Sequence, residues 1–379
     1  MMNRRALMTA AAALTGGLMS PGFSLASEPK LDLRQVLTSE KVPALAVAVV
    51  TAKGPPVISV QGLRRADGRL KVAPEDAWLI ADNTMGVTSA IYARLVQAGR
   101  LHWDTPLAEL FPKLTLDAGW KSQTAKALFA HRTGVDDRVW ITPEWLNARH
   151  ADTRPARVQR ADLAAQILAE PPSLASGPFL LARANYILAG AAMEAVCDQD
   201  FVDLAHDEAF DWWGAAEAGF GAPLGENPSG HRLGPDGAYV AVPAGELADY
   251  PAVMQPATGA HLSLASYGRF IQLILTNGGG WLSPDQLSRL ARPYDSATST
   301  YALGWRLKPE LGWAKGPVIG HEGSNGLWRH SVVIAPERDL AVIVACNADN
   351  EVACQKALQL ALKAYNPEQP PSFNELNLG

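Results

Sequence analysis

Residue patterns that could do chemistry are scarce in this sequence. No G-x-S-x-G, H-E-x-x-H or phosphate-binding loop is present, and no spacing typical of a metal or cofactor site. The one S-x-x-K runs from Ser27 to Lys30. This spacing places a hydroxyl and an amine on one face of a helical turn, where the amine could take the hydroxyl proton. These two residues follow a predicted cleavage site, so we do not expect them to be catalytic.

A second candidate is the polar start of a predicted helix. The segment LIADNTMGVTSAIYARLVQAG, residues 79 to 99, places Asp82 before the helix and Met85 one turn later. Aspartate at a helix start accepts backbone N–H bonds, which stabilises the helix by about 0.5–2 kcal/mol. The alternative is a carboxylate that acts as a nucleophile or activates a water. A methionine here fills apolar space and cannot accept a proton.

A third candidate is the run His321, Glu322 and Gly323 on a predicted strand. Alternating side chains place His321 and Glu322 on opposite faces of the strand, so Glu322 is not counted as catalytic. Gly323 would let a ligand approach the strand backbone, and His321 could contact that ligand. The alternative for His321 is a plain strand residue.

Both ends of the chain are predicted to form strands, and the middle is predicted to be helical. Apolar β-branched runs indicate two hairpins, one from residue 44 past the Gly-Pro-Pro turn and one over residues 331–348, and a further strand begins at residue 301. Helical periodicity at 31–37 and 351–365 indicates terminal helices that flank the sheet. Five further helices are predicted at 83–98, 126–130, 160–169, 186–196 and 265–277.

These patterns predict an α/β (α+β) fold with an antiparallel sheet built from both chain ends. We expect the sheet domain over 27–75 and 298–365, an inserted, mostly helical domain over 76–297, and a flexible tail over 366–379.

Residues 1–26 have the pattern of an export signal. Arg4 and Arg5 precede the apolar run ALMTAAAALTGGLM, and small residues surround a cut after Ala26. The paired arginines are compatible with twin-arginine export. The apolar run is too short and too broken for a stable membrane span, so we predict a periplasmic or secreted protein.

Composition limits the class of partner. The chain has 379 residues, 48% of them hydrophobic, and a net charge of −5, which indicates a globular protein and gives no reason to expect a nucleic-acid partner. Cys197, Cys346 and Cys354 allow one internal disulfide at most. A pairing of Cys346 with Cys354 is conceivable, and buried free thiols are the favoured state.

Five segments resemble, in order, the serine β-lactamase and penicillin-binding-protein superfamily, above all its class C and esterase-like branch. The resemblance covers roughly residues 40 to 365, and it implies this fold and acyl transfer through a serine. The segments are WLIADNTMGVTSAIYARLVQAGRLHWDTPLAELFP, ALFAHRTGV, NYILAGAAMEAV, YALGWRL and GHEGSNGLWRHSVVIAPERDLAVIVACNA.

The resemblance assigns roles to positions at which this chain departs from the family. The S-x-x-K serine and lysine positions hold Asp82 and Met85, and the Y-x-N positions hold Leu181 and Arg183. The nucleophile, its base and the proton shuttle are therefore absent. The third motif, K-T-G or H-x-G, persists at residues 321–323, on the strand that supplies an oxyanion-hole N–H in the family.

Two of these substitutions have opposite charge and would face each other across the cleft. We predict an ion pair between Asp82 and Arg183, near His321; the alternative is an Arg183 that points to solvent. Binding of a small acyl, peptide or carboxylate ligand by Asp82, Arg183, His321 and Gly323 could persist without chemistry. His131, in AHRTGV, is interpreted as a structural histidine bonded to backbone.

Three functional interpretations follow. The first is an exported, non-hydrolytic family member that retains a ligand-binding cleft. The second is a hydrolase of the β-lactamase, esterase or D-alanyl peptidase kind, with residual activity or with activity repurposed through Asp82 and a bound water. The third is a binding or scaffolding protein of the cell envelope.

Overall fold

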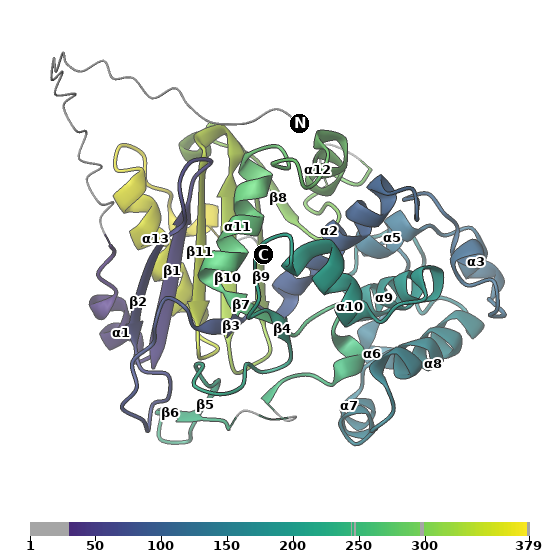
Figure 1. Cartoon of the computed structure of the whole chain (residues 1–379), viewed down its shortest axis with the longest axis horizontal. Coiled ribbons are helices and arrows are strands. Elements are labelled where there is room, and N and C mark those ends of the chain that lie inside the picture. The colour runs from purple at the N-terminus through teal and green to yellow at the C-terminus, as the bar shows by residue number, and fades with distance from the viewer. Residues whose placement is uncertain (1–29, 244, 246–247, 296–298, 377–379) are drawn as a thin grey trace, which may run out of the picture.

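The computed structural model describes residues 30–243, 245, 248–295 and 299–376 (Figure 1). The predicted export signal, residues 1–26, and Ser27 of the S-x-x-K lie outside the described residues. Within the described ranges, no helix is both long enough and apolar enough to cross a membrane.

The main sheet has six antiparallel strands in the order β2-β1-β11-β10-β9-β8, so the first two strands of the chain pair with its last four. Strand β1 joins the two sets because it pairs with β11, from Leu45 opposite Cys346 to Val50 opposite Ala341. The predicted sheet built from both chain ends is confirmed. Its strands are β1 (Ala44–Val50), β2 (Val57–Gly62), β8 (Arg306–Leu311), β9 (Gly316–Ser324), β10 (Arg329–Ala335) and β11 (Leu340–Cys346).

Both faces of this sheet are covered, which explains the unbroken apolar run of β1. Alternate residues of β1 belong to two different cores: Ala46 and Ala48 to one, Val47 and Val49 to the other. Helices α1 (Arg34–Glu40) and α13 (Glu351–Tyr365) cover one face, and α11 (Leu264–Leu275) packs on β1 and β11 from the other (Figure 1). Helix α11 was predicted within the inserted segment, but it forms a layer of the sheet domain.

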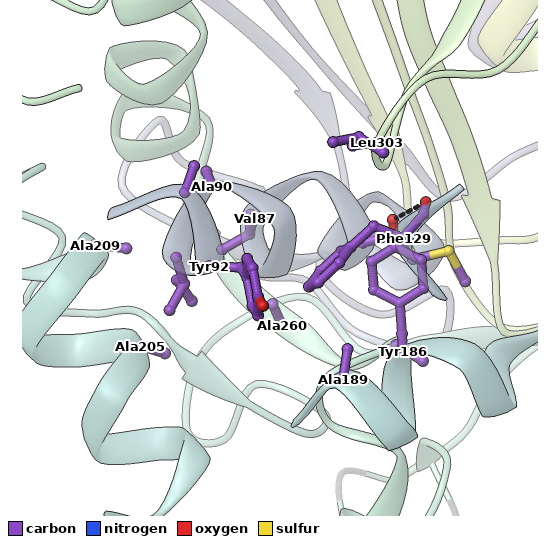
Figure 2. Close-up of a cluster of buried hydrophobic side chains, with 14 of the residues drawn as sticks. Val87, Ala90, Tyr92, Phe129, Tyr186, Ala189, Ala205, Ala209, Ala260 and Leu303 are labelled. Carbon is purple, nitrogen blue, oxygen red and sulfur yellow. Dashed lines mark hydrogen bonds between the residues drawn. The ribbon is translucent and has the colours of Figure 1, made fainter. Parts of the chain in front are cut away.

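The inserted segment is mostly helical and surrounds α2 (Thr84–Gln97), whose side chains are nearly all buried. Figure 2 shows Val87, Ala90 and Tyr92 of α2 among side chains of the neighbouring helices. The other helices are α3 (Leu107–Leu110), α4 (Ala118–Lys121), α5 (Ala125–Phe129), α6 (Asp137–Trp140), α7 (Pro143–His150), α8 (Ala156–Ala169), α9 (Arg183–Cys197), α10 (Phe201–Ala205) and α12 (Pro284–Ala291).

The remaining elements are short strands and short helical turns. A small sheet has the order β3-β7-β4, and a separate hairpin joins β5 to β6. These strands are β3 (Ala77–Leu79), β4 (Gly219–Phe220), β5 (His231–Leu233), β6 (Tyr239–Ala241) and β7 (Ala260–Ser263), and the short helical turns are η1 (Ala81–Asn83), η2 (His206–Phe210), η4 (Ala252–Met254), η5 (Gly312–Ala314) and η6 (Pro336–Arg338).

The described part of the C-terminal tail packs on the sheet domain. Helix α14 (Phe373–Leu376) buries Leu376 in the core beneath α13. The Lys308 ammonium donates to the carbonyl oxygens of Asn374 at 2.9 Å and Glu375 at 3.2 Å. Over residues 366–376 this packing departs from the flexible tail predicted for 366–379.

Candidate functional site

The candidate site lies where β3 ends and α2 begins. Between them the chain turns through η1, and Ala81 adopts a left-handed backbone angle, φ 47°. Asn83 fixes this turn to the main sheet because its Nδ2 donates to the carbonyl oxygens of Ile80 at 3.0 Å and His330 at 3.2 Å. The turn therefore holds Asp82 beside β9.

Asp82 and Arg183 form a two-pronged ion pair. Arg183 Nε donates to Asp82 Oδ1 at 2.8 Å, and Nη2 donates to Oδ2 at 2.7 Å. The Asp82 side chain is 11% exposed and that of Arg183 27% exposed. The predicted ion pair is confirmed. The interpretation of Asp82 as a helix cap is wrong, since neither η1 nor α2 has a side-chain cap hydrogen bond.

Arg183 is held by groups on three sides. Its backbone N–H and that of Ala184 donate to the Asp137 carboxylate at 2.7 and 2.9 Å, so Asp137 accepts from the start of α9. The Tyr250 ring centre lies 5.0 Å from the guanidinium carbon. Burial acts most strongly and lowers the pKa of Arg183, but the charge and hydrogen bonds of Asp82, together with the charges of Tyr250 and Asp137, outweigh it and the pKa is raised. Burial raises the pKa of Asp137 despite its two hydrogen bonds.

Met85 is the second residue of α2, three positions after Asp82, and is fully buried in the larger core. Its thioether contributes apolar volume and no basic group, as the sequence predicted. The neighbouring Thr84 hydroxyl donates to the carbonyl oxygen of Ala81 at 2.6 Å and accepts from the N–H of Ala260 at 3.1 Å. The Thr84 hydroxyl at the start of α2 therefore bonds to the backbone of two other segments of the same chain.

Gly323 provides room for the chain itself. A Cβ at this position would lie 2.5 Å from the Asp82 nitrogen and 3.1 Å from the Asn83 nitrogen. The prediction that Gly323 leaves space for a ligand is therefore corrected: the backbone of η1 occupies that space.

His321 is 1% exposed, and its Nδ1 lies 2.8 Å from the Glu322 carbonyl oxygen, while Nε2 has no partner among the described residues. Burial lowers the pKa of His321 to about 4, so the ring is neutral at pH 7.

Comparison with known proteins shows the family of this chain. The family model described as beta-lactamase matches residues 31–365. The chain belongs to the beta-lactamase family. No curated protein sequence matches it significantly.

Three solved structures show the same fold as this beta-lactamase family member. The octameric penicillin-binding protein homologue from Pyrococcus abyssi is 18% identical with a TM-score of 0.74, over 90% of this chain and 78% of that one. The penicillin-binding protein from Bacillus halodurans is 19% identical with a TM-score of 0.71, over 88% and 100%. The D-alanine carboxypeptidase AmpC from Burkholderia cenocepacia is 18% identical with a TM-score of 0.68, over 88% and 99%. At these identities the likeness shows the fold alone.

Leu181 and His131 have separate roles in this beta-lactamase family member. Leu181 precedes α9 with its side chain 38% exposed, outside the ion pair. His131 is fully buried, and its Nδ1 accepts from the Ala182 N–H at 3.3 Å. The prediction of a structural histidine bonded to backbone is confirmed.

Sequence reasoning missed Asp137, Asp249 and Tyr250. Two cavities, of about 270 and 240 Å³, share Asp249, Tyr250 and His150 in their walls. Burial raises the pKa of Asp249 to about 6. Asp137 begins α6, a helix of four residues that is too short to show a periodic pattern, and the segment with Asp249 and Tyr250 contained no recognisable motif. Among the described residues, no group of three or more His, Cys, Asp or Glu side chains could hold a metal ion.

Proposed function

We propose that this protein is a non-hydrolytic member of the beta-lactamase family that acts by binding. The ion pair between Asp82 and Arg183 is the observation that carries this proposal. Serine-dependent acyl transfer needs a hydroxyl and a nearby base. Here the corresponding turn presents a carboxylate already bound to a guanidinium, and the next turn presents the buried thioether of Met85. Losing the nucleophile of such a unit costs on the order of a million-fold in turnover.

Two other hydroxyls near the site do not restore this chemistry. Ser89 is fully buried on α2, and its Oγ lies 3.1 Å from the Tyr186 hydroxyl. Burial raises the pKa of Tyr186 well above its usual value, so the phenol stays protonated and is no base. Ser324 Oγ accepts from the Gly326 N–H at 2.9 Å. Among the described residues, neither hydroxyl has a hydrogen-bond partner that would take its proton.

A turnover assay tests the proposal. The purified protein is incubated with a chromogenic cephalosporin and with a p-nitrophenyl acyl ester, and we expect no release of chromophore above the buffer rate. The control is Asp82→Asn, which keeps the side-chain shape and removes the charge. Release that persists through repurification contradicts the proposal. If that release is lost in Asp82→Asn, the protein is a hydrolase that uses this carboxylate.

The place of action is a second part of the proposal. The signal-like residues 1–26 support export to the periplasm or medium, where the protein would bind a component of the cell envelope. Fractionation of cells that express the full chain tests this. Recovery of a shortened protein in the periplasm or medium agrees with it, and a full-length cytoplasmic protein contradicts it.

A further inference from the structure

The cavities beside Tyr250 contain a buried acid, Asp249, that has no salt-bridge partner among the described residues. The Asp249 carboxylate accepts from Asn325 Nδ2 at 3.0 Å and from the Tyr250 N–H. Among the described residues, no Lys, Arg or His nitrogen lies within 4.0 Å of it. The neighbouring guanidinium of Arg183 directs Nε and Nη2 to Asp82 instead. The Arg183 charge still acts on Asp249 from a greater distance, so Asp249 contributes to the walls of both cavities a negative charge without a salt-bridge partner of its own.

Further acceptors line the smaller cavity. Thr258 and Gln159 are 1% and 3% exposed, and neither Thr258 Oγ1 nor Gln159 Oε1 has a hydrogen-bond partner among the described residues. Asp249 lies close to the residue that follows Thr258, because a Cβ on Gly259 would lie 2.8 Å from Asp249 Oδ2, and Gln159 lines the same cavity. A buried polar side chain without a partner is costly to the fold, so these side chains are expected to gain one when a ligand is bound.

The arginines of this cavity already form ion pairs, although Arg149 Nε has no hydrogen-bond partner among the described residues. Arg149 and Arg154 both bind Asp152, at 2.9 and 2.7 Å, and Arg154 also binds Asp162 at 2.7 Å. An anion would have to displace these carboxylates. Beside the one Arg149 donor, the cavity therefore offers two acceptors without partners and a carboxylate without a salt bridge, which suit a group that only donates hydrogen bonds.

We propose that the cavity lined by Gln159, Asp249, Tyr250 and Thr258 binds a small organic ammonium ion. A primary ammonium has three N–H donors and no acceptor, which matches the Asp249 carboxylate with the Thr258 and Gln159 oxygens. The rings of Tyr250 and Phe220 in the cavity wall would face the apolar part of the ligand. A volume of about 240 Å³ corresponds to about eight non-hydrogen atoms at the volume of one water each. This inference deepens the proposed binding function by naming its ligand class.

Three matched probes test the ligand class by isothermal titration calorimetry at pH 8, where Asp249 is ionised. Benzylamine is the ammonium, benzyl alcohol its neutral counterpart and benzoate its anionic counterpart, all of nearly the same shape. We expect benzylamine to bind and the other two to bind at least tenfold more weakly. Absence of benzylamine binding overturns the proposal. Benzoate binding that equals or exceeds benzylamine binding also overturns it, because the arginines would then dominate the cavity.

Two variants of similar shape test the residues. Asp249→Asn removes the charge, and we expect it to weaken benzylamine binding about 10- to 100-fold. Thr258→Val removes one acceptor and should weaken binding several-fold, while thermal unfolding confirms that both variants fold. Unchanged affinity in Asp249→Asn overturns the proposal. None of these outcomes bears on acyl turnover, so a failure here is distinguishable from a failure of the proposed non-hydrolytic function.

Discussion

The ion pair between Asp82 and Arg183 should contribute more to stability than an exposed pair of the same chemistry. Opposite charges about 4 Å apart attract by about 4 kcal/mol at an effective dielectric constant of 20. Solvent reduces this value, because the Arg183 side chain is 27% exposed and that of Asp82 11% exposed. A double-mutant cycle with alanine at both positions should therefore yield a coupling energy of about 2–3 kcal/mol.

The matched control is the pair of Arg138 with Asp136. It has the same two-pronged geometry, with a closest N–O distance of 2.6 Å, but the Arg138 side chain is 80% exposed. Its coupling energy should stay below about 1 kcal/mol. The cap that Asp136 provides for α6 does not disturb the comparison, since its loss enters both arms of the cycle and cancels.

Urea unfolding followed by circular dichroism measures both cycles. Equal slopes against urea for all variants show that the unfolded state has not changed, so that midpoints report stability. A coupling energy for Asp82 and Arg183 that is no larger than the control would refute the reasoning. It would mean that the Asp82 carboxylate and the Arg183 guanidinium do not stay together in solution in the largely buried arrangement of the structure.

Three further predictions concern the surroundings of the site. Gly323→Ala should destabilise the protein by about 2–3 kcal/mol in urea unfolding, since the new Cβ would press on the backbone of η1; a change below about 0.5 kcal/mol contradicts that contact. Because burial raises the pKa of Asp249 to about 6, the folded state holds this proton more tightly than the unfolded chain does. As pH rises from 4 to 7, the wild type should therefore lose about 2 kcal/mol relative to Asp249→Asn; equal pH profiles contradict this. In thiol titration, half-buried Cys197 should react in the folded protein and buried Cys346 and Cys354 only after denaturation; fewer than three thiols in the denatured protein would indicate a disulfide.

Much of the fold could be predicted from local patterns. The apolar runs of β1 and β11 were readable as strands because both faces of the sheet are buried, so neither run needs polar alternation. Helix α13 was readable from its 3.6-residue period. The position of α11 against the sheet could not be read from the sequence. The amphipathic pattern indicates that a helix has an apolar face, but not which element covers that face. The short strand β3 gave no signal either, because three residues are too few for a period.

The site was only partly predictable. Asp82 and Arg183 could be paired in advance because their opposite charges fall at positions that the family places across one cleft. Asp137 and Tyr250 could not be found this way, since they contact Arg183 only through the tertiary fold, 46 and 67 positions away in the printed sequence. The prediction that Gly323 lets another group approach the strand backbone closely was right. The group that approaches is the backbone of η1 and not a ligand. A sequence shows that space is needed, and the structure shows what fills it.

Intact-mass spectrometry after incubation with a fluorescent penicillin tests the central claim most directly. The account predicts an unchanged protein mass, because the turn before α2 presents the Asp82 carboxylate bound to Arg183 and no hydroxyl with a base. A mass increase equal to one penicillin, mapped by peptide sequencing to any side chain of this site, would contradict it.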